Sequence, residues 1–468
     1  MTQDGVPAIS LAVWRDGKII WEEGFGWADR ENRVTATEHT MFCLASLSKT
    51  MTAAAVMTLV QAGKMQLDAP INDYLGDDKL RSPFGDARGA TVRRVANHSS
   101  GLPAADQFFY GGEAAQLPSM SQTIQRYGFL EAPPGERFEY SNLGYGILGH
   151  AAAHAAGKSY TDLMRENVFL PLGMTHSSVD VPPELQQYQA QRYDYTGKRI
   201  PYYWSAEPAS ASVYASAHDL ARFGMALLGN RLDDQQEILT QAARDQMVSA
   251  PYRESATVGY GLGLEILEHG GYRMIQHGGS TSGVRSILTV VPAENFGVVV
   301  LANKDTQIHT EIRDAVFKAM LSNWREPEPK PKASAAAGKA EQPGFRPDAA
   351  WQGTWRGTVH TYEGELPMEL RIQPSGDVHV RVGIEAMPSR SNAQLMSLLD
   401  HIEFKDGVLT GRALSQIQNS DTKRSPHTVS LALKLRGKTL SGRVSAVSLY
   451  DGLWIYNLPY WTELTRSR

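Results

Sequence analysis

A stretch rich in proline, lysine and alanine, residues 327–338, divides the chain into two parts with different hydrophobic patterns. Proline favours extended backbone, and the alanine, serine and glycine that follow offer nothing large to bury, so the stretch is typical of an exposed linker. The sequence therefore predicts two folded regions. We place the first at residues 1–324, the linker at 325–347 and the second at 348–468.

The first region has the pattern of a mixed α/β fold. Alternating apolar residues predict a strand at 9–13, and Asp16-Gly17 predicts a two-residue turn into a second strand. Periodicity also predicts a helix from Met51 to Gln61, a helix from Asn142 to His154 that ends at Gly157, and a pair of strands at 285–291 and 297–302.

The second region has a different texture, in which apolar and polar residues alternate along short segments. Glycine-containing turns separate these segments. One apolar face, one polar face and short turns indicate a meandering antiparallel sheet, which we expect to close as a barrel. The alternating runs are Met368, Leu370 and Ile372; Val378, Val380 and Val382; and Val429, Leu431, Leu433 and Leu435.

Composition excludes several classes of protein. Of the 468 residues, 42% are hydrophobic and 21% charged, which excludes a disordered or collagen-like chain. A formal net charge of -4 gives no electrostatic sign of a nucleic-acid partner. The single Cys43 excludes a disulfide within the chain and a multi-cysteine metal site. Apolar runs stay well below the about 18 residues that a membrane span needs.

The N-terminus lacks the marks of an export signal. Residues 1–5 have no basic start, no apolar core and no small-residue cleavage site, and a predicted strand follows at once. Because a domain seldom opens so abruptly, we expect that upstream residues were removed from the natural product.

The segment from Phe42 to Thr50 contains a Ser-x-x-Lys pair ahead of a predicted helix. Ser46 and Lys49 are three residues apart, so on a helix they share a face. A lysine that is partly removed from water has a lowered pKa and can take the proton of a serine hydroxyl. A serine at a helix start also offers its backbone N–H to a developing oxyanion, although such a serine is commonly only an N-cap.

Two later stretches carry further candidates. Tyr140 and Asn142 lie where a loop enters a helix, and a structural alternative is an asparagine cap beside a buried tyrosine. His277 is followed by Gly278, Gly279 and Ser280, just ahead of the strand at 285–291. The two glycines would let a substrate backbone lie along a sheet edge, whereas the alternative is a turn with a solvent-facing histidine.

The order and spacing of Ser-x-x-Lys, Tyr-x-Asn and His-x-Gly resemble the penicillin-recognising serine hydrolases. The resemblance is to the branch with class C β-lactamases, serine DD-peptidases, D-aminopeptidases and related esterases. It covers about residues 5–320 and includes the flanking segments 24–29, 97–103 and 170–174. It implies an α/β (α+β) serine β-lactamase-like catalytic domain, with an antiparallel sheet flanked by helices.

The resemblance implies a role for each candidate. Ser46 would be the acylated nucleophile, Lys49 would share its proton, and Tyr140 would be general base in one half-reaction and general acid in the other. Asn142 would orient Lys49 and the acyl amide of the substrate. The backbone N–H groups of Ser46 and Ser280 would form the oxyanion hole.

Two departures from the family pattern bear on the substrate. His277 stands where β-lactamases of this branch usually have lysine, and a histidine near its ordinary pKa of about 6.5 is mostly neutral at pH 7. This lowers the expectation of efficient β-lactam hydrolysis and favours peptidase or esterase relatives. Residues 209–214 replace a glycine pair that relatives often have.

Other motifs favour structural interpretations. His150 and His154 are one helical turn apart, but the carboxylate of a zinc-protease helix is missing between them, so we expect packing or surface residues and no metal. Neither a Gly-x-Ser-x-Gly elbow nor a phosphate loop is present. After the linker, Gly353-Thr354-Trp355 is similar to the first strand of lipocalin-type barrels, and the alternative is an ordinary tryptophan in a β core.

The sequence thus predicts a serine hydrolase that acts through an acyl-enzyme on a small amide or peptide, as a D-amino-acid peptidase or β-lactamase-like enzyme, without a cofactor. The alternatives are a promiscuous carboxylesterase and a weakly catalytic penicillin-binding protein. The expected partner is a small-molecule or short-peptide substrate, with no nucleic acid and no membrane span. Self-association into a homo-oligomer stays open. Because relatives are often exported, we expect a periplasmic or secreted protein after processing.

Overall fold

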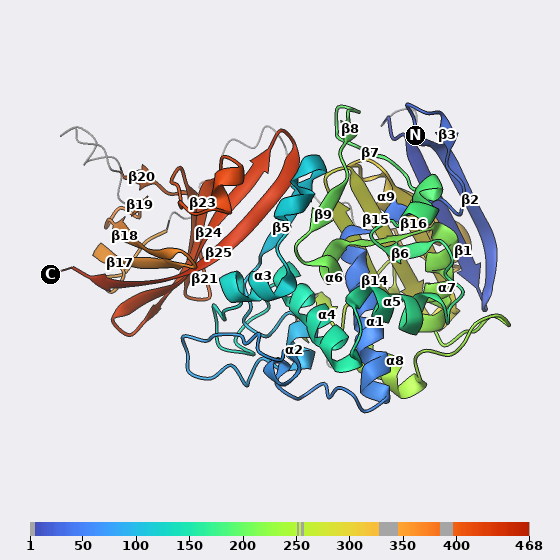
Figure 1. The fold of residues 1–468 in the computed structure, drawn as a ribbon, viewed down its shortest axis with the longest axis horizontal. Coiled ribbons are helices and arrows are strands. Elements are labelled where there is room, and N and C mark those ends of the chain that lie inside the picture. The colour runs from blue at the N-terminus through green and yellow to red at the C-terminus, as the bar shows by residue number, and fades with distance from the viewer. Residues whose placement is uncertain (1–4, 250–251, 254–256, 327–344, 384–395, 468) are drawn as a thin grey trace.

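The computed structural model describes residues 5–249, 252–253, 257–326, 345–383 and 396–467, which form two regions (Figure 1). The first region is built on a nine-stranded antiparallel sheet with helices on both faces, as the sequence and the resemblance predict. The strands, in their order across the sheet, are β11 (Tyr252–Arg253), β12 (Val258–Tyr260), β13 (Glu265–His269), β14 (Tyr272–Thr281), β15 (Val284–Val291), β16 (Phe296–Ala302), β1 (Ala8–Arg15), β2 (Lys18–Asp29) and β3 (Val34–Thr35).

The central strands are buried on both faces, which is why nearly all of their residues are apolar. Along β1, Ile9, Leu11 and Val13 pack in the cluster that contains Phe317 of α9 (Ile308–Met320). Alternate residues such as Trp14 face the larger helical layer. This layer contains α1 (Ser48–Gln61), α2 (Val92–Ala96), α3 (Met120–Tyr127), α4 (Asn142–Ala156), α5 (Tyr160–Met164), α6 (Pro208–Ala211), α7 (Ala217–Leu227) and α8 (Gln241–Val248).

Turn and cap residues lie where the sequence predicts them. Asp16 (φ 52°) and Gly17 (φ 72°) join β1 to β2, and both have the positive φ of a type I′ hairpin turn. Helix α4 ends at Gly157, whose φ of 67° gives the left-handed C-cap that favours glycine. The predicted strands at 9–13, 285–291 and 297–302 are confirmed as β1, β15 and β16.

The second region is a nearly closed antiparallel barrel. Trp355, Val380 and Leu433 point into its core, which confirms the predicted alternation. The end strands β20 and β21 follow each other in sequence through Leu399, whose N–H donates to the Val378 carbonyl. The strand order is β20 (Ser397–Leu398), β19 (Val378–Val382), β18 (Gly364–Ile372), β17 (Gly353–Thr361), β25 (Leu453–Arg466), β24 (Thr439–Tyr450), β23 (Thr428–Arg436), β22 (Val408–Ala413) and β21 (Asp400–Lys405).

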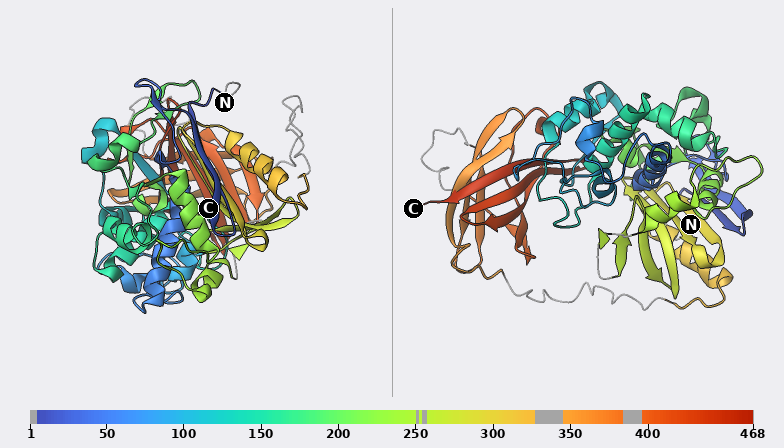
Figure 2. Two further views of the ribbon diagram at one scale, coloured as in Figure 1. Left: turned by 90° about the vertical axis from the view of Figure 1, so that its right-hand side faces the viewer. Right: turned by 90° about the horizontal axis from the view of Figure 1, so that it is seen from below.

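The β24–β25 hairpin extends beyond the barrel and joins the two regions. β25 pairs with β17 in the barrel, and at Tyr456 and Asn457 it pairs with β5 (Asp106–Tyr110) of the first region. β5 in turn pairs with β9 (Tyr203–Ser205), so one hydrogen-bonded sheet runs from the barrel into the first region. Figure 2 shows the barrel beside the helical layer, with the long strands directed toward it.

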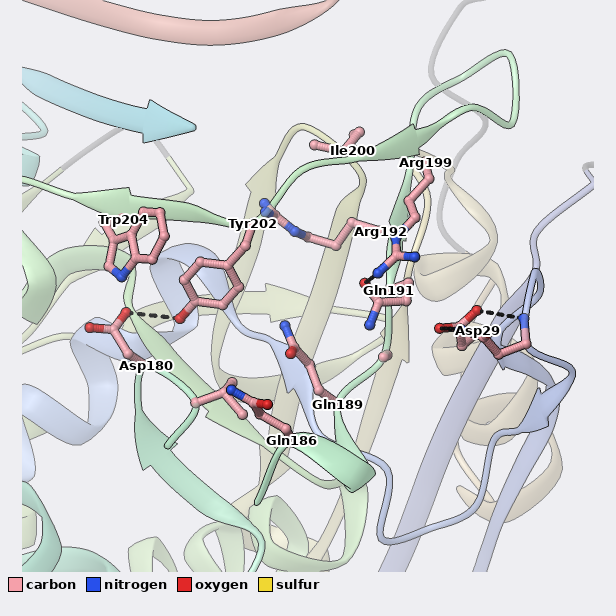
Figure 3. Close-up of a pocket in the computed structure, with 13 residues that line it drawn as sticks. Asp29, Asp180, Gln186, Gln189, Gln191, Arg192, Arg199, Ile200, Tyr202 and Trp204 are labelled. Carbon is pink, nitrogen blue, oxygen red and sulfur yellow. Dashed lines mark hydrogen bonds between the residues drawn. The ribbon is translucent and has the colours of Figure 1, made fainter. Parts of the chain in front are cut away.

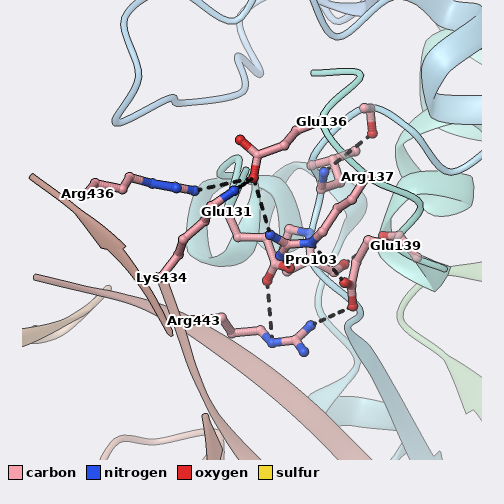
Figure 4. Close-up of polar contacts among 11 residues, drawn as sticks. Pro103, Glu131, Glu136, Arg137, Glu139, Lys434, Arg436 and Arg443 are labelled. Atoms are coloured by element: carbon pink, nitrogen blue, oxygen red, sulfur yellow. Dashed lines mark hydrogen bonds and ion pairs between the residues drawn. The ribbon is translucent and has the colours of Figure 1, made fainter. Parts of the chain in front are cut away.

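A charged cluster forms a second contact between the regions (Figure 4). Arg443 of β24 contacts both Glu131, at 3.4 Å, and Glu139, at 3.2 Å. Arg137 also pairs with Glu131, and Lys434 of β23 pairs with Glu136 at 2.8 Å. The cluster thus ties the barrel to the loop that leads into α4.

The predicted linker, 325–347, falls largely outside the described residues. α9 ends at Met320 and β17 begins at Gly353, so the boundaries of both domains stay predictions. Among the described helices, none combines the length and the apolar character needed to cross a membrane.

Candidate active site

Ser46 lies in a one-turn 3-10 helix, η1 (Ala45–Leu47), directly before α1. Leu44 donates its N–H to the Val213 carbonyl of β10 (Val213–Ala215), and its own carbonyl accepts the Ser286 hydroxyl at 2.8 Å. Ala45 has a φ of 48°, a left-handed conformation that is strained for a residue with a side chain. Ser46 is therefore held in a tight turn that the contacts of Leu44 stabilise.

Lys49 is fully buried and its amine reaches Ser46. Nζ lies 3.1 Å from Ser46 Oγ, 2.7 Å from Asn142 Oδ1 and 3.1 Å from the Ser210 carbonyl. A charged ammonium has three protons, and these three acceptors satisfy all of them. In the neutral amine, one proton is replaced by a lone pair, which can then accept the Ser46 proton. The geometry therefore suits both protonation states.

Burial lowers the pKa of Lys49 to about 7. Removal from water disfavours the charged amine, whereas the nearby Asp106 and Glu207 act in the opposite direction and raise the pKa. The three direct partners are all uncharged. Near neutral pH both the ammonium and the amine are therefore populated beside Ser46.

Asn142 is free to serve Lys49 because its neighbour caps the helix. Ser141 is the N-cap of α4, and its hydroxyl accepts the Gly144 N–H at 2.8 Å. The Asn142 side chain instead accepts from Lys49 and donates Nδ2 to Asp106 Oδ2 at 3.1 Å. The sequence left Asn142 as either a helix cap or a partner of Lys49. In the structure Ser141 is the cap, and Asn142 contacts Lys49.

Tyr140 lies over the same amine, supported by a histidine. Lys49 Nζ is 4.8 Å from the centroid of the Tyr140 ring. The centroids of the His98 and Tyr140 rings are 4.3 Å apart. His98 is buried and its Nδ1 accepts the Ser141 N–H at 3.1 Å. Burial and the charge on Lys49 hold the pKa of His98 well below its usual range, so His98 is a neutral support for the Tyr140 loop.

His277 is an interior group, not a solvent-facing one. It is 2% exposed; its Nε2 accepts the Tyr260 hydroxyl at 2.7 Å, and its Nδ1 donates to the Gly278 carbonyl at 2.6 Å. Burial, with a contribution from Lys49, lowers the pKa of His277 to about 3. The ring is therefore neutral at pH 7 and offers no cation to a substrate carboxylate.

The two glycines after His277 have different surroundings. A Cβ on Gly279 would lie 1.9 Å from the Leu44 carbonyl oxygen, whereas one on Gly278 would be 3.5 Å from the Ser286 carbonyl oxygen. Gly279 therefore lets β14 approach the turn before Ser46, a role that sequence analysis did not assign. Ser280, one residue further on, is exposed, and its hydroxyl accepts from Arg285.

Several neighbours of the site were missed by sequence reasoning. Asp106 and Glu207 are buried carboxylates near Lys49, and Ser210 supplies a carbonyl to it. His98 lies in segment 97–103, which is one of the segments that resemble the family, but the resemblance predicted no role for this residue. Asp106 lies in an ordinary apolar strand and had no signal, because its partners come from distant parts of the chain.

A polar pocket of about 600 Å³ lies in the first region, and Ser46 is not among the residues that line it (Figure 3). Its walls carry both signs of charge, from Asp29 and Asp180 and from Arg192 and Arg199. Tyr202, which also lines it, donates its hydroxyl to Asp180 at 3.2 Å.

His150 and His154 take packing and surface positions. His150 Nε2 is 3.1 Å from Asp78 Oδ2, and His154 is exposed. Within the described ranges, no three or more His, Cys, Asp or Glu side chains gather as a metal site would require.

Fold and site together define a β-lactamase-like protein with a Ser-x-x-Lys centre. The family model "Beta-lactamase" matches residues 1–321, and the chain belongs to this family of serine hydrolases. Among relatives, the human "Putative beta-lactamase-like 1" is 26% identical over 403 residues, which cover 81% of this chain and 75% of that protein. The "Unguisins hydrolase ungD'" of Aspergillus campestris is 28% identical, covering 64% of this chain and 58% of that protein.

Solved structures share the fold. A class C β-lactamase superposes with a TM-score of 0.57 at 24% identity, covering 67% of this chain and 90% of that one. The octameric penicillin-binding protein homologue from Pyrococcus abyssi has a TM-score of 0.59 at 23% identity, covering 99% of this chain and 97% of that one. The second match extends over the barrel as well as the first region.

Proposed function

We propose that this protein is a serine hydrolase that forms an acyl-enzyme at Ser46 with small amide or peptide substrates. The observation that carries the proposal is the buried Lys49 amine, 3.1 Å from Ser46 Oγ and surrounded by uncharged acceptors. A lysine in this setting can accept a proton near neutral pH, which an exposed lysine cannot do.

In acylation, Ser46 Oγ attacks the substrate carbonyl carbon while its proton passes to the Lys49 amine. The carbonyl oxygen becomes an oxyanion, which the N–H groups of Ser46 and Ser280 would stabilise. Tyr140 would then give a proton to the leaving group as the bond from the carbonyl carbon breaks. In deacylation, Tyr140 would take the proton of the attacking water, and the Ser46 oxygen would leave with a proton from Lys49.

The neutral His277 bears on the substrate class. A fixed cation beside the site would attract a substrate carboxylate, but His277 is neutral and buried against Tyr260. This favours peptidase or esterase activity over efficient β-lactam hydrolysis. It also keeps a carboxylesterase as the second candidate, because a simple ester needs no carboxylate partner.

The test is turnover and acylation of the full chain. We expect the wild type to hydrolyse at least one of a D-alanyl anilide, a p-nitrophenyl ester or benzylpenicillin, and to gain the mass of the acyl group. Ser46→Ala should lose both the turnover and the adduct, whereas the control Ser375→Ala, in an exposed barrel turn, should keep them. An adduct that persists in Ser46→Ala would overturn the proposal.

The relative rates decide between the candidates. A preference for the anilide indicates a peptidase, and a preference for the ester indicates a carboxylesterase. A benzylpenicillin adduct that lasts for hours without turnover of any of the three would support a penicillin-binding protein instead. Export, self-association and the likeness of the barrel to lipocalins stay predictions.

A further inference from the structure

The barrel reaches the catalytic centre through Trp454, at the start of β25. Its indole Nε1 donates to Asp106 Oδ1, and the other oxygen of Asp106 accepts Asn142 Nδ2 at 3.1 Å. Asn142 Oδ1 in turn accepts Lys49 Nζ at 2.7 Å, and Lys49 contacts Ser46 Oγ at 3.1 Å. An unbroken chain of hydrogen bonds therefore runs from the barrel to the nucleophile.

Trp454 is held in place by its backbone. Its N–H donates to the Ser282 hydroxyl at 3.1 Å, and its carbonyl accepts the Tyr110 hydroxyl at 2.9 Å. Two residues further along β25, Tyr456 pairs with Gln107 of β5. The indole thus reaches Asp106 from a docked strand and not from a free loop end.

Asp106 depends on its two donors. The carboxylate is 8% exposed, and the donors described for it, the Trp454 indole and the Asn142 amide, are both uncharged. A buried carboxylate keeps its charge only where hydrogen bonds or opposite charges replace water. Lys49 supplies an opposite charge, but from behind Asn142.

The carboxylate also decides which way the Asn142 amide faces. Because a charged carboxylate only accepts hydrogen bonds, it selects Nδ2 and leaves Oδ1 toward Lys49. The opposite rotamer would place an NH₂ group against the Lys49 amine. Asp106 therefore determines that Lys49 meets an acceptor.

We propose that Asp106 and Trp454 are positioning residues of the catalytic centre: the barrel indole holds the Asp106 carboxylate, which orients Asn142 and supplies a negative charge opposite Lys49. This rests on the proposed acylation of Ser46. Neither residue touches the reacting atoms, so both act through Asn142 and Lys49.

Other titratable groups also face Lys49, and their charges contribute to the pH dependence of acylation. Among them, His98 and His277 are held neutral by burial, and burial raises the pKa of Glu207 well above its usual range. Burial also raises the pKa of Asp106, but its donors and Lys49 oppose this. The groups are Asp106 on β5, Glu207 before α6, His98 after α2, His277 on β14, and Tyr140 and Tyr145 before and in α4.

The sign of the expected shift follows from these charges. Acylation should rise with pH as Lys49 loses its proton. Asp106→Asn removes a negative charge, which lowers the pKa of Lys49 and moves the rise to lower pH. Trp454→Phe removes a donor from Asp106, favours its neutral form and moves the rise in the same direction by a smaller amount.

The experiment measures the rate at which an alkyl fluorophosphonate labels Ser46, from pH 5 to 9, by intact mass. We expect the rise to move down by about one pH unit in Asp106→Asn and by about half a unit in Trp454→Phe, with a rate at the plateau about tenfold lower in both. The double variant should match Asp106→Asn. The shift should be equal for a methyl and a long-chain probe, because Trp454 does not act by contacting the substrate.

Trp461→Phe is the matched control, because this indole lies on the same strand but donates to Glu463 at 3.3 Å. It should keep the wild-type profile. Lower rates without a shift, shifts that add in the double variant, or a shift in Trp461→Phe would overturn the proposal while leaving the acyl-enzyme intact. A wild type that is not labelled at Ser46 would overturn the proposed function itself, and circular dichroism would show whether each variant is folded.

Discussion

Two cations with little exposure to solvent, Lys49 in the proposed catalytic centre and Arg443 at the barrel contact, are stabilised in opposite ways. The three hydrogen-bond acceptors described for Lys49 are uncharged, and the carboxylates of Asp106 and Glu207 act on it from a distance. Arg443, whose side chain is 16% exposed, touches Glu131 and Glu139 directly. Burial lowers the pKa of both, but at Arg443 the two carboxylates outweigh it, so its pKa is raised, whereas that of Lys49 falls to about 7.

The difference shows what separates a structural cation from a reactive one. Direct contact with a carboxylate keeps a guanidinium charged and joins two regions, and removal of one partner then leaves an uncompensated charge. A cation that is separated from its countercharge by one intervening side chain is stabilised enough to be buried, yet it can release its proton. In this chain Asn142 is that intervening residue.

The largest effect should come from replacing Lys49. Lys49→Arg keeps a positive charge that cannot be released, and Lys49→Met removes the charge, so both should lower acylation of Ser46 by at least about 1,000-fold. Burst kinetics with a p-nitrophenyl ester measure this loss. If Lys49→Arg kept more than a tenth of the wild-type rate, Lys49 would be acting as a charge and not as a base.

Disturbing the close approach of β14 to the Ser46 turn should lower activity almost as much. Gly279→Ala places a methyl group against the Leu44 carbonyl and should lower kcat/KM by about 100-fold, since a small displacement of reacting groups is enough for such a loss. The neighbouring Gly278→Ala has room and serves as the control. It should fold normally and change KM by a few-fold at most; equal losses in the two variants would contradict the assigned packing.

Breaking the Arg443 contact should affect stability more than catalysis. Arg443→Met removes one of the two arginines that pair with the buried Glu131, whose side chain is 1% exposed, and leaves Arg137 as its partner; this should cost about 3 kcal/mol of folding stability. Thermal unfolding followed by circular dichroism measures the loss. Adding Glu131→Gln should restore part of it, and a double variant no more stable than Arg443→Met would contradict the pairing.

The smallest effect is expected at the edge of the same cluster. Lys434 pairs with Glu136 at 2.8 Å, but its side chain is 30% exposed, so Lys434→Ala should cost under about 1 kcal/mol. In 1 M salt the difference from wild type should shrink further, because exposed ion pairs are screened. A larger loss of stability that does not depend on salt would contradict this, because it would show that the Lys434–Glu136 pair behaves as a buried ion pair.

Local patterns carried much of the fold and the core of the site. The type I′ turn at Asp16-Gly17, the helix that ends at Gly157 and the alternating barrel strands are encoded in neighbouring residues, so periodicity and turn chemistry were sufficient. Ser46, Lys49 and Asn142 were predicted from spacing and resemblance, and the structure brings these three together.

Other features could not be predicted because they depend on contacts between distant segments. The bond between Trp454 and Asp106 joins residues 348 positions apart, and neither lies in a recognisable motif. His277 was expected to be neutral from its ordinary pKa, but its burial against Tyr260 depends on how β12 and β14 lie in the sheet. The packing of Gly279 against the Leu44 carbonyl was also missed, because Leu44 lies far away in the sequence; the predicted role of Gly279 in substrate binding stays a prediction.

The most direct test of the central claim is the titration of Lys49 itself, followed by NMR of protein labelled with ¹³C at the lysine Cε. We predict that one Cε resonance titrates near pH 7 and that this resonance is missing in Lys49→Met. If every lysine of the folded protein titrated above pH 9.5, Lys49 would be charged at neutral pH and could not take the Ser46 proton.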